Sequence, residues 1–103
     1  PAPQLHSLHL SLPKLRLCYY QLIRLMRDLF QRCHLVHADL SEYNVLYLNS
    51  QLYLIDVAQA VDYDHPFALD FLRRDCETVN AFFRRGGITN ALTVRELFNF
   101  ITD

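Results

Sequence analysis

The chain has 103 residues, 51% of them hydrophobic and 13% aromatic, which allows one domain with a modest core. Its ten basic and eleven acidic residues give a net charge of -1, so the basic field typical of nucleic-acid-binding domains is absent. No apolar run reaches the roughly 18 residues of a membrane span. Three widely spaced cysteines do not suggest a disulfide framework and favour a reducing, cytoplasmic compartment.

The first predicted element after an extended entry segment, residues 1–12, is a long helix. Ser11 is a plausible N-cap and Pro13 fits the first turn. From there to about Cys33 the apolar residues recur at steps of three and one, which indicates one buried helical stripe. The stripe consists of Leu15, Cys18, Tyr19, Leu22, Ile23, Met26, Leu29, Phe30 and Cys33.

A short β-hairpin is predicted next, with strands at residues 45–48 and 52–55 around a three-residue loop. Both strands are apolar on both faces, so we expect the hairpin to be covered on each side. In this register Asn44 stands opposite Asp56, and directly opposed residues have Cα atoms roughly 4.5–5.5 Å apart. The two side chains would then project together from the open end of the hairpin.

The C-terminal part is predicted to be helical after an irregular segment at residues 57–65. A second helix should begin at Pro66, with Asp64 or His65 as its cap, and should stop at the glycine pair 86–87. A third helix should follow the capping box formed by Thr93 and Glu96. The second helix carries Phe67, Ala68, Phe71, Leu72, Cys76, Val79, Phe82 and Phe83 on its apolar side.

The residues able to do chemistry lie between these elements. His37, Asp39 and Asn44 have the spacing H-x-D-x-x-x-x-N, and Asp56 follows the hairpin. One carboxylate for the acceptor group, then an amide and a second carboxylate for Mg²⁺, is the layout of a phosphoryl-transfer site. We therefore predict Asp39 as the catalytic base, Asn44 and Asp56 as metal ligands, and His37 as a residue that fixes the loop. Asp75 either reaches back to the loop backbone or is solvated.

The segment 35–44, LVHADLSEYN, resembles the catalytic loop of the RIO family of atypical protein kinases, type-1 subgroup. The segment 55–61, IDVAQAV, resembles that family's metal-binding segment, with Ala58 and Ala60 in place of two serines. Further matching words are DHP at 64–66, ALDFLRRDC at 68–76 and TVRELF at 93–98. The resemblance covers essentially the whole chain, residues 1–103.

The resemblance implies an α+β fold, the C-terminal lobe of a protein-kinase-like domain, mostly helical with a short antiparallel hairpin that carries the metal-binding aspartate. It implies ATP and Mg²⁺ as cofactors, serine in a protein substrate as the acceptor, and a role in cytoplasmic maturation of pre-40S ribosomal particles. It also implies that Asp56 accepts phosphate transiently, as an aspartyl-phosphate.

These 103 residues lack the elements with which kinases bind a nucleotide. Its only glycines are Gly86 and Gly87 and its only lysine is Lys14, so no phosphate-cradling loop or phosphate-pairing lysine is present. We therefore expect a fragment of a longer protein whose N-terminal lobe and hinge bind the nucleotide. Two alternatives stay open: a catalytically incomplete binding or assembly module, and a small-molecule phosphotransferase of the aminoglycoside-kinase type.

Overall fold

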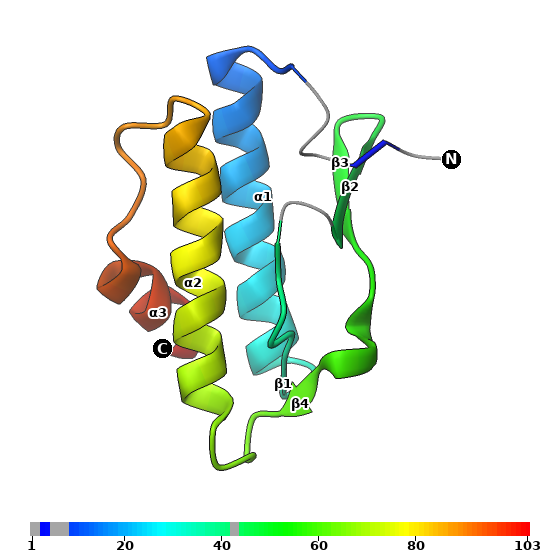
Figure 1. Cartoon of the computed structure of the whole chain (residues 1–103), viewed down its shortest axis with the longest axis vertical. Helices are drawn as coiled ribbons and strands as arrows, with labels where there is room; N and C mark the ends of the chain where they lie inside the picture. Colours follow the sequence, from blue (N-terminus) through cyan, green and yellow to red (C-terminus); the bar gives the residue numbers. More distant parts are fainter. Residues whose placement is uncertain (1–2, 5–8, 42–43) are drawn as a thin grey trace.

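The computed structural model describes residues 3–4, 9–41 and 44–103. This part of the chain holds three α-helices: α1 (Leu12–Gln31), α2 (Ala68–Arg85) and α3 (Val94–Thr102). It also holds four short strands, β1 (Leu35–Val36), β2 (Val45–Leu48), β3 (Gln51–Leu54) and β4 (Val61–Asp62), in two antiparallel pairs. Figure 1 shows the helices gathered on one side and the strands on the other. None of the described helices is long and apolar enough to cross a lipid bilayer.

Helix α1 forms largely as its sequence predicts. The Ser11 side chain accepts a hydrogen bond from the Lys14 N–H, and proline occupies the first turn. The helix ends at Gln31, so Cys33 lies beyond it and is exposed, contrary to the prediction that it belongs to the buried stripe. The six buried residues of α1 are all from that stripe: Leu15, Cys18, Tyr19, Leu22, Ile23 and Met26.

Helix α2 runs beside α1 (Figure 1), and Tyr19 of α1 packs edge-on against Phe83 of α2. It begins at Ala68, two residues later than predicted, because a turn occupies the expected first positions. In that turn the Ala68 N–H bonds to the His65 carbonyl, and His65 Nδ1 accepts the N–H of Phe67. Phe67 is exposed rather than part of the apolar side.

Helix α3 begins with the predicted capping box, in which Thr93 and Glu96 bond reciprocally to each other's backbone N–H. Its C-terminal carbonyls are bound by α1. Arg27 donates to the carbonyl of Phe100, and Gln31 Nε2 donates to that of Ile101 at 2.9 Å. A cation near a helix C-terminus also interacts favourably with the helix dipole. α3 is therefore fixed across the helical layer and completes the core.

The hairpin register differs from the prediction by one residue. Val45 pairs with Leu54, and a two-residue turn of Asn49 and Ser50 joins the strands. Both turn residues have positive φ (51° and 63°), which is the type I′ geometry whose twist matches paired strands. The prediction failed because it gave the loop three residues. It follows that Asn44 stands opposite Ile55, not opposite Asp56.

Two further expectations about the strands were wrong. The hairpin is not covered on both faces, because Tyr53 is 48% exposed. The segment 57–65 is not wholly irregular: it contains a 3₁₀ turn, Val57–Gln59, and then β4, which pairs with β1. This pairing places β4, which follows the hairpin, beside β1, which directly precedes the loop of residues 37–44.

Candidate active site

The loop of residues 37–44 starts from a strand that is held on several sides. β1 pairs with β4 and contacts both α1 and α2. Val36 is 1% exposed, and the Tyr63 N–H bonds to the carbonyl of His34 just before the strand. The position at which the loop begins is therefore fixed by the core.

The His37 side chain connects the loop to the segment after the hairpin. The ring is 2% exposed, and its Nε2 lies 3.2 Å from the carbonyl oxygen of Ile55. Its Nδ1 accepts the N–H of Asp39 at 3.2 Å. A nitrogen that accepts a hydrogen bond carries no proton, so the geometry assigns the proton to Nε2. His37 thus has the loop-fixing position predicted for it.

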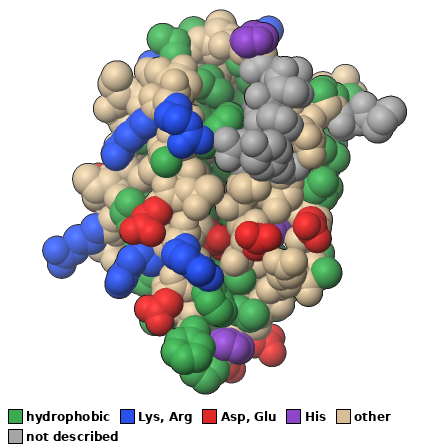
Figure 2. Space-filling model, in the orientation of Figure 1, with side chains coloured by type: hydrophobic (Ala, Val, Ile, Leu, Met, Phe, Trp, Pro, Cys, Tyr) green, Lys and Arg blue, Asp and Glu red, His purple; other side chains and the backbone are tan. Residues whose placement is uncertain are grey.

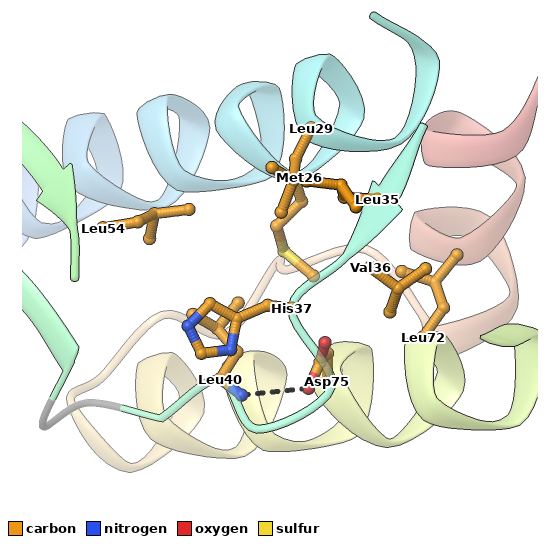
Figure 3. Close-up of a pocket in the computed structure, with 9 residues that line it drawn as sticks. All are labelled: Met26, Leu29, Leu35, Val36, His37, Leu40, Leu54, Leu72 and Asp75. Atoms are coloured by element: carbon orange, nitrogen blue, oxygen red, sulfur yellow. Dashed lines mark hydrogen bonds between the residues drawn. The ribbon is translucent and has the colours of Figure 1, made fainter. Parts of the chain in front are cut away.

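Asp75, buried on α2, holds the loop backbone (Figure 3). Its two carboxylate oxygens accept the N–H groups of Ala38 (2.9 Å) and Leu40 (3.0 Å). Ala38 has φ 73°, a conformation that costs an L-residue roughly 1–2 kcal/mol. Burial raises the pKa of Asp75, while the two backbone N–H groups act in the opposite direction. The question left open by the sequence is settled: Asp75 reaches the loop and is not solvated.

The interior behind these residues is closed. The side chains of Figure 3 enclose a void of about 10 Å³, which is at most the room for one water molecule. Apolar side chains from α1, β1 and β3, including Met26 and Leu54, line it together with His37 and Asp75. A ligand must therefore approach the loop from its outer side.

Asn44 ties the loop to the hairpin. It is 7% exposed, and its Nδ2 donates to the carbonyl of Asp39 at 3.0 Å. Its Oδ1 accepts the Ser41 N–H at 2.7 Å, and its backbone carbonyl accepts the Ile55 N–H at 3.0 Å. Asn44 is thus bonded to Asp39 on one side and to the residue before Asp56 on the other.

Asp39 and Asp56 themselves are exposed. Within the described residues, neither carboxylate has a hydrogen bond or an ion pair. Asp56 lies two residues past β3 and has φ 60°, so its direction is set by this left-handed conformation and not by the hairpin register. Figure 2 shows acidic side chains exposed at mid-height on the face that carries the loop and the segment after β3.

These residues suit a magnesium ion in their chemistry. Mg²⁺ prefers oxygen ligands and keeps several waters, so a free carboxylate and one amide oxygen are enough. Asp56 supplies the carboxylate. The Oδ1 of Asn44 accepts the Ser41 N–H at 2.7 Å and the Ser41 hydroxyl at 3.4 Å, and rotation of that hydroxyl would leave one lone pair of the amide oxygen for the ion. No group of three or more His, Cys, Asp or Glu side chains able to hold a metal occurs in ranges 3–4, 9–41 and 44–103.

Sequence reasoning missed one of the groups that hold the loop and left the role of another, Asp75, open. The Ile55 carbonyl, which faces His37, belongs to the backbone and leaves no sequence signal. Asp75 did leave one, because it is a charged residue inside the buried stripe of α2, next to Cys76. A carboxylate at such a position is rarely buried without partners, and this could have favoured the loop-bound interpretation.

Comparison with known proteins shows first to which class of protein the relatives of this chain belong. Curated relatives along the whole chain are serine/threonine-protein kinases: rio1 of Dictyostelium discoideum, 53% identical over 99% of this chain, and RIO1 of Homo sapiens, 53% over 100%. RIO3 of Mus musculus is 50% identical over 99%. The family model of the RIO domain matches residues 1–97. The chain therefore belongs to the RIO domain family, as the resemblance predicted, and it spans about a fifth (18–20%) of the length of these relatives.

Proposed function

We propose that residues 1–103 are the C-terminal lobe of a RIO-type serine/threonine protein kinase or ATPase. The observation that carries the proposal is the exposure of the Asp39 and Asp56 carboxylates on a backbone that is held in place. Both carboxylates are exposed and unpaired within the described residues, yet the backbone around them is fixed by buried Asp75, His37 and Asn44. A free carboxylate on a backbone that hydrogen bonds hold on both sides is the arrangement that positioning of a reacting group requires.

In this proposal Asp39 is the catalytic base. Its carboxylate accepts the proton of the acceptor serine hydroxyl and orients the oxygen toward the phosphoryl group. The Asn44 amide, bonded to the Asp39 carbonyl, and His37, bonded to the Asp39 N–H, limit its motion on both sides. This restriction keeps the carboxylate in position without using its own oxygens.

Asp56 and Asn44 would hold Mg²⁺. When bound, the ion would neutralise the negative charge of the ATP phosphates. Ala58 and Ala60, where the family pattern has serines, bring no hydroxyl to the segment that follows Asp56.

Asp56 is also proposed to accept phosphate transiently. A carboxylate oxygen of Asp56 would form a bond to the γ-phosphorus as the bond to the β,γ-bridging oxygen breaks, and ADP would leave with that electron pair. Water would then hydrolyse the acyl phosphate. The exposure of Asp56 and its lack of a partner within the described residues support this role.

The nucleotide grip, the protein substrate and the cellular role are proposed from the family resemblance. The two glycines follow α2 and Lys14 lies in α1, so the phosphate-binding loop and lysine would be supplied by parts of the protein outside these 103 residues. Relatives carry names of protein kinases, which supports a serine acceptor in a protein. We propose action on pre-40S ribosomal particles in the cytoplasm.

The test compares the full-length protein with Asp39→Asn and Asp56→Asn, using radiolabelled ATP and a serine-containing protein substrate. Each variant should lose roughly 10²-fold or more of its phosphoryl transfer, the usual contribution of such a group. Asp28→Asn is the matched control, because Asp28 is an exposed α1 carboxylate that pairs with Arg32. Near-normal turnover in either variant would contradict the role given to that residue.

Calorimetric titration separates the alternatives. The full-length protein should bind Mg-ATP and the 103-residue chain should not. If the full-length protein also binds none, the assembly-module interpretation replaces the kinase one. Transfer to an aminoglycoside but not to protein serine would favour the small-molecule phosphotransferase.

A further inference from the structure

A second pocket lies away from the proposed active site, between α2 and the first half of α3. Its volume is about 460 Å³. Its lining includes two guanidinium groups from different helices, one amide and two apolar side chains, and no carboxylate: Arg73, Val94, Arg95, Phe98 and Asn99. Figure 2 shows basic side chains over α2 and beside α3 on the face drawn.

The two arginines of this pocket are unpaired. Within the described residues neither Arg73 nor Arg95 has a hydrogen bond, ion pair or ring contact. Other arginines of the same helical layer do have partners: Arg74 lies 4.9 Å from the ring centroid of Phe71, and Arg84 donates to the carbonyl of Leu92. Two like charges at one cavity repel each other, and a bound anion would remove that repulsion.

The neighbouring acidic residues do not neutralise the pair. Glu96 is engaged at the start of α3, where its carboxylate accepts the Thr93 N–H at 2.9 Å. Asp70 and Glu77, three and four residues from Arg73 on α2, are exposed and make no ion pair with it. The first turn of α3 also adds the positive end of a helix dipole beside Arg95.

We propose that this pocket binds the phosphate group of a phosphoserine- or phosphothreonine-containing peptide segment. A phosphomonoester carries nearly two negative charges and three acceptor oxygens, which match two guanidinium forks and the amide of Asn99. The side chains of Val94 and Phe98 offer an apolar wall to the residues next to the phosphate. Recognition of phosphorylated segments by arginine clusters is a recurrent mode of peptide binding.

The geometry favours a phosphopeptide over nucleic acid. A nucleic-acid backbone is bound by cations that follow it over several phosphates, often with aromatic side chains between them. Here two arginines line one cavity, and the chain has a net charge of -1. The site uses none of the residues assigned to catalysis, so its existence does not depend on the proposed function.

The test measures binding to the full-length protein by fluorescence anisotropy. The probe is a labelled pool of peptides with one fixed phosphoserine and degenerate flanks, and its unphosphorylated twin is the reference. The phosphorylated pool should bind and the twin should not. Arg73→Gln and Arg95→Gln should each weaken binding by about 10-fold or more, as expected when one charge-assisted hydrogen bond is lost. Inorganic phosphate should compete.

Arg74→Gln is the matched control, because Arg74 is the next residue on α2 and lies over Phe71 instead. It should bind the pool like the parent protein, and Arg73→Gln and Arg95→Gln should keep the parent unfolding midpoint. The proposal is wrong if the two pools bind equally, or if Arg73→Gln and Arg95→Gln bind as tightly as Arg74→Gln. It is also wrong if a single-stranded RNA oligonucleotide binds more tightly than the phosphorylated pool and the same two substitutions abolish that binding.

Discussion

Replacing Asp75 by asparagine should displace the loop that carries Asp39. The carboxylate accepts two backbone N–H groups, and an asparagine side chain offers only one oxygen. Its amide group would face the N–H of either Ala38 or Leu40, so one buried donor loses its partner. A hydrogen bond to a charged group contributes about 1.5–3 kcal/mol, and a buried unsatisfied N–H costs about 1–3 kcal/mol. Because these terms overlap, we expect Asp75→Asn to lower the free energy of unfolding by about 2–4 kcal/mol.

The measurement is urea-induced unfolding of the 103-residue chain, followed by circular dichroism. The control is Asp70→Asn on the same helix, since Asp70 is exposed in the first turn of α2 and its charge favours the helix dipole by about 0.3–1 kcal/mol. In the full-length protein, at a temperature where the variant is folded, phosphoryl transfer should fall by ~10²-fold, because a displacement of about 1 Å is enough for that loss. Equal unfolding free energies for Asp75→Asn and Asp70→Asn would refute the reasoning.

Three further predictions concern stability, each measured by urea unfolding. Tyr19→Phe should lower it by about 1–3 kcal/mol, because the hydroxyl that donates to the buried Asn80 Oδ1 and accepts the Leu92 N–H is lost; an unchanged midpoint would contradict this. Ser50→Gly should raise it by up to about 1 kcal/mol, because glycine adopts the turn's positive φ without strain; a decrease would argue against the turn geometry. Burial raises the pKa of Cys18 to about 11 and of Cys76 to about 12, from 9.0. Since both folded-state values are raised, stability present below pH 9 should be lost as the pH rises toward 11 and 12, and Cys76→Ala should reduce this dependence.

The helices were predictable from local signals. The α1 stripe has a regular spacing, and the Thr93–Glu96 capping box is complete within four residues. The hairpin was predictable in existence but not in register, because Asn49 and Ser50 take left-handed conformations that shorten the loop to two residues. A one-residue shift reverses the face of every side chain in a strand, so this small error changed the predicted neighbour of Asn44.

The contacts that hold the candidate site in place were less predictable from the sequence than the site residues themselves. The strands β1 and β4 have two residues each, and the residues that pair are 27 (Leu35 and Asp62) and 25 (Val36 and Val61) positions apart. A strand of two residues is too short for its hydrophobic pattern to be recognised in the sequence. Likewise, the place of Asp75 in the buried stripe of α2 indicates a buried carboxylate, but it does not show that the partners are the N–H groups of Ala38 and Leu40, 37 and 35 residues earlier. Contacts of this kind depend on tertiary packing, which local propensities do not contain.

The chain reversals around the site are made without glycine. His34, Ala38 and Asp56 all have positive φ, whereas the two glycines of the chain follow α2. Glycine would relieve the strain of these positions but would also give the unfolded chain more conformations to lose on folding. A loop built from ordinary residues in unusual conformations has few alternative shapes of similar energy. Directed-evolution libraries that place glycine at these three positions should therefore yield proteins that fold but whose loops sample several arrangements, visible as broadened amide resonances of residues 38–41.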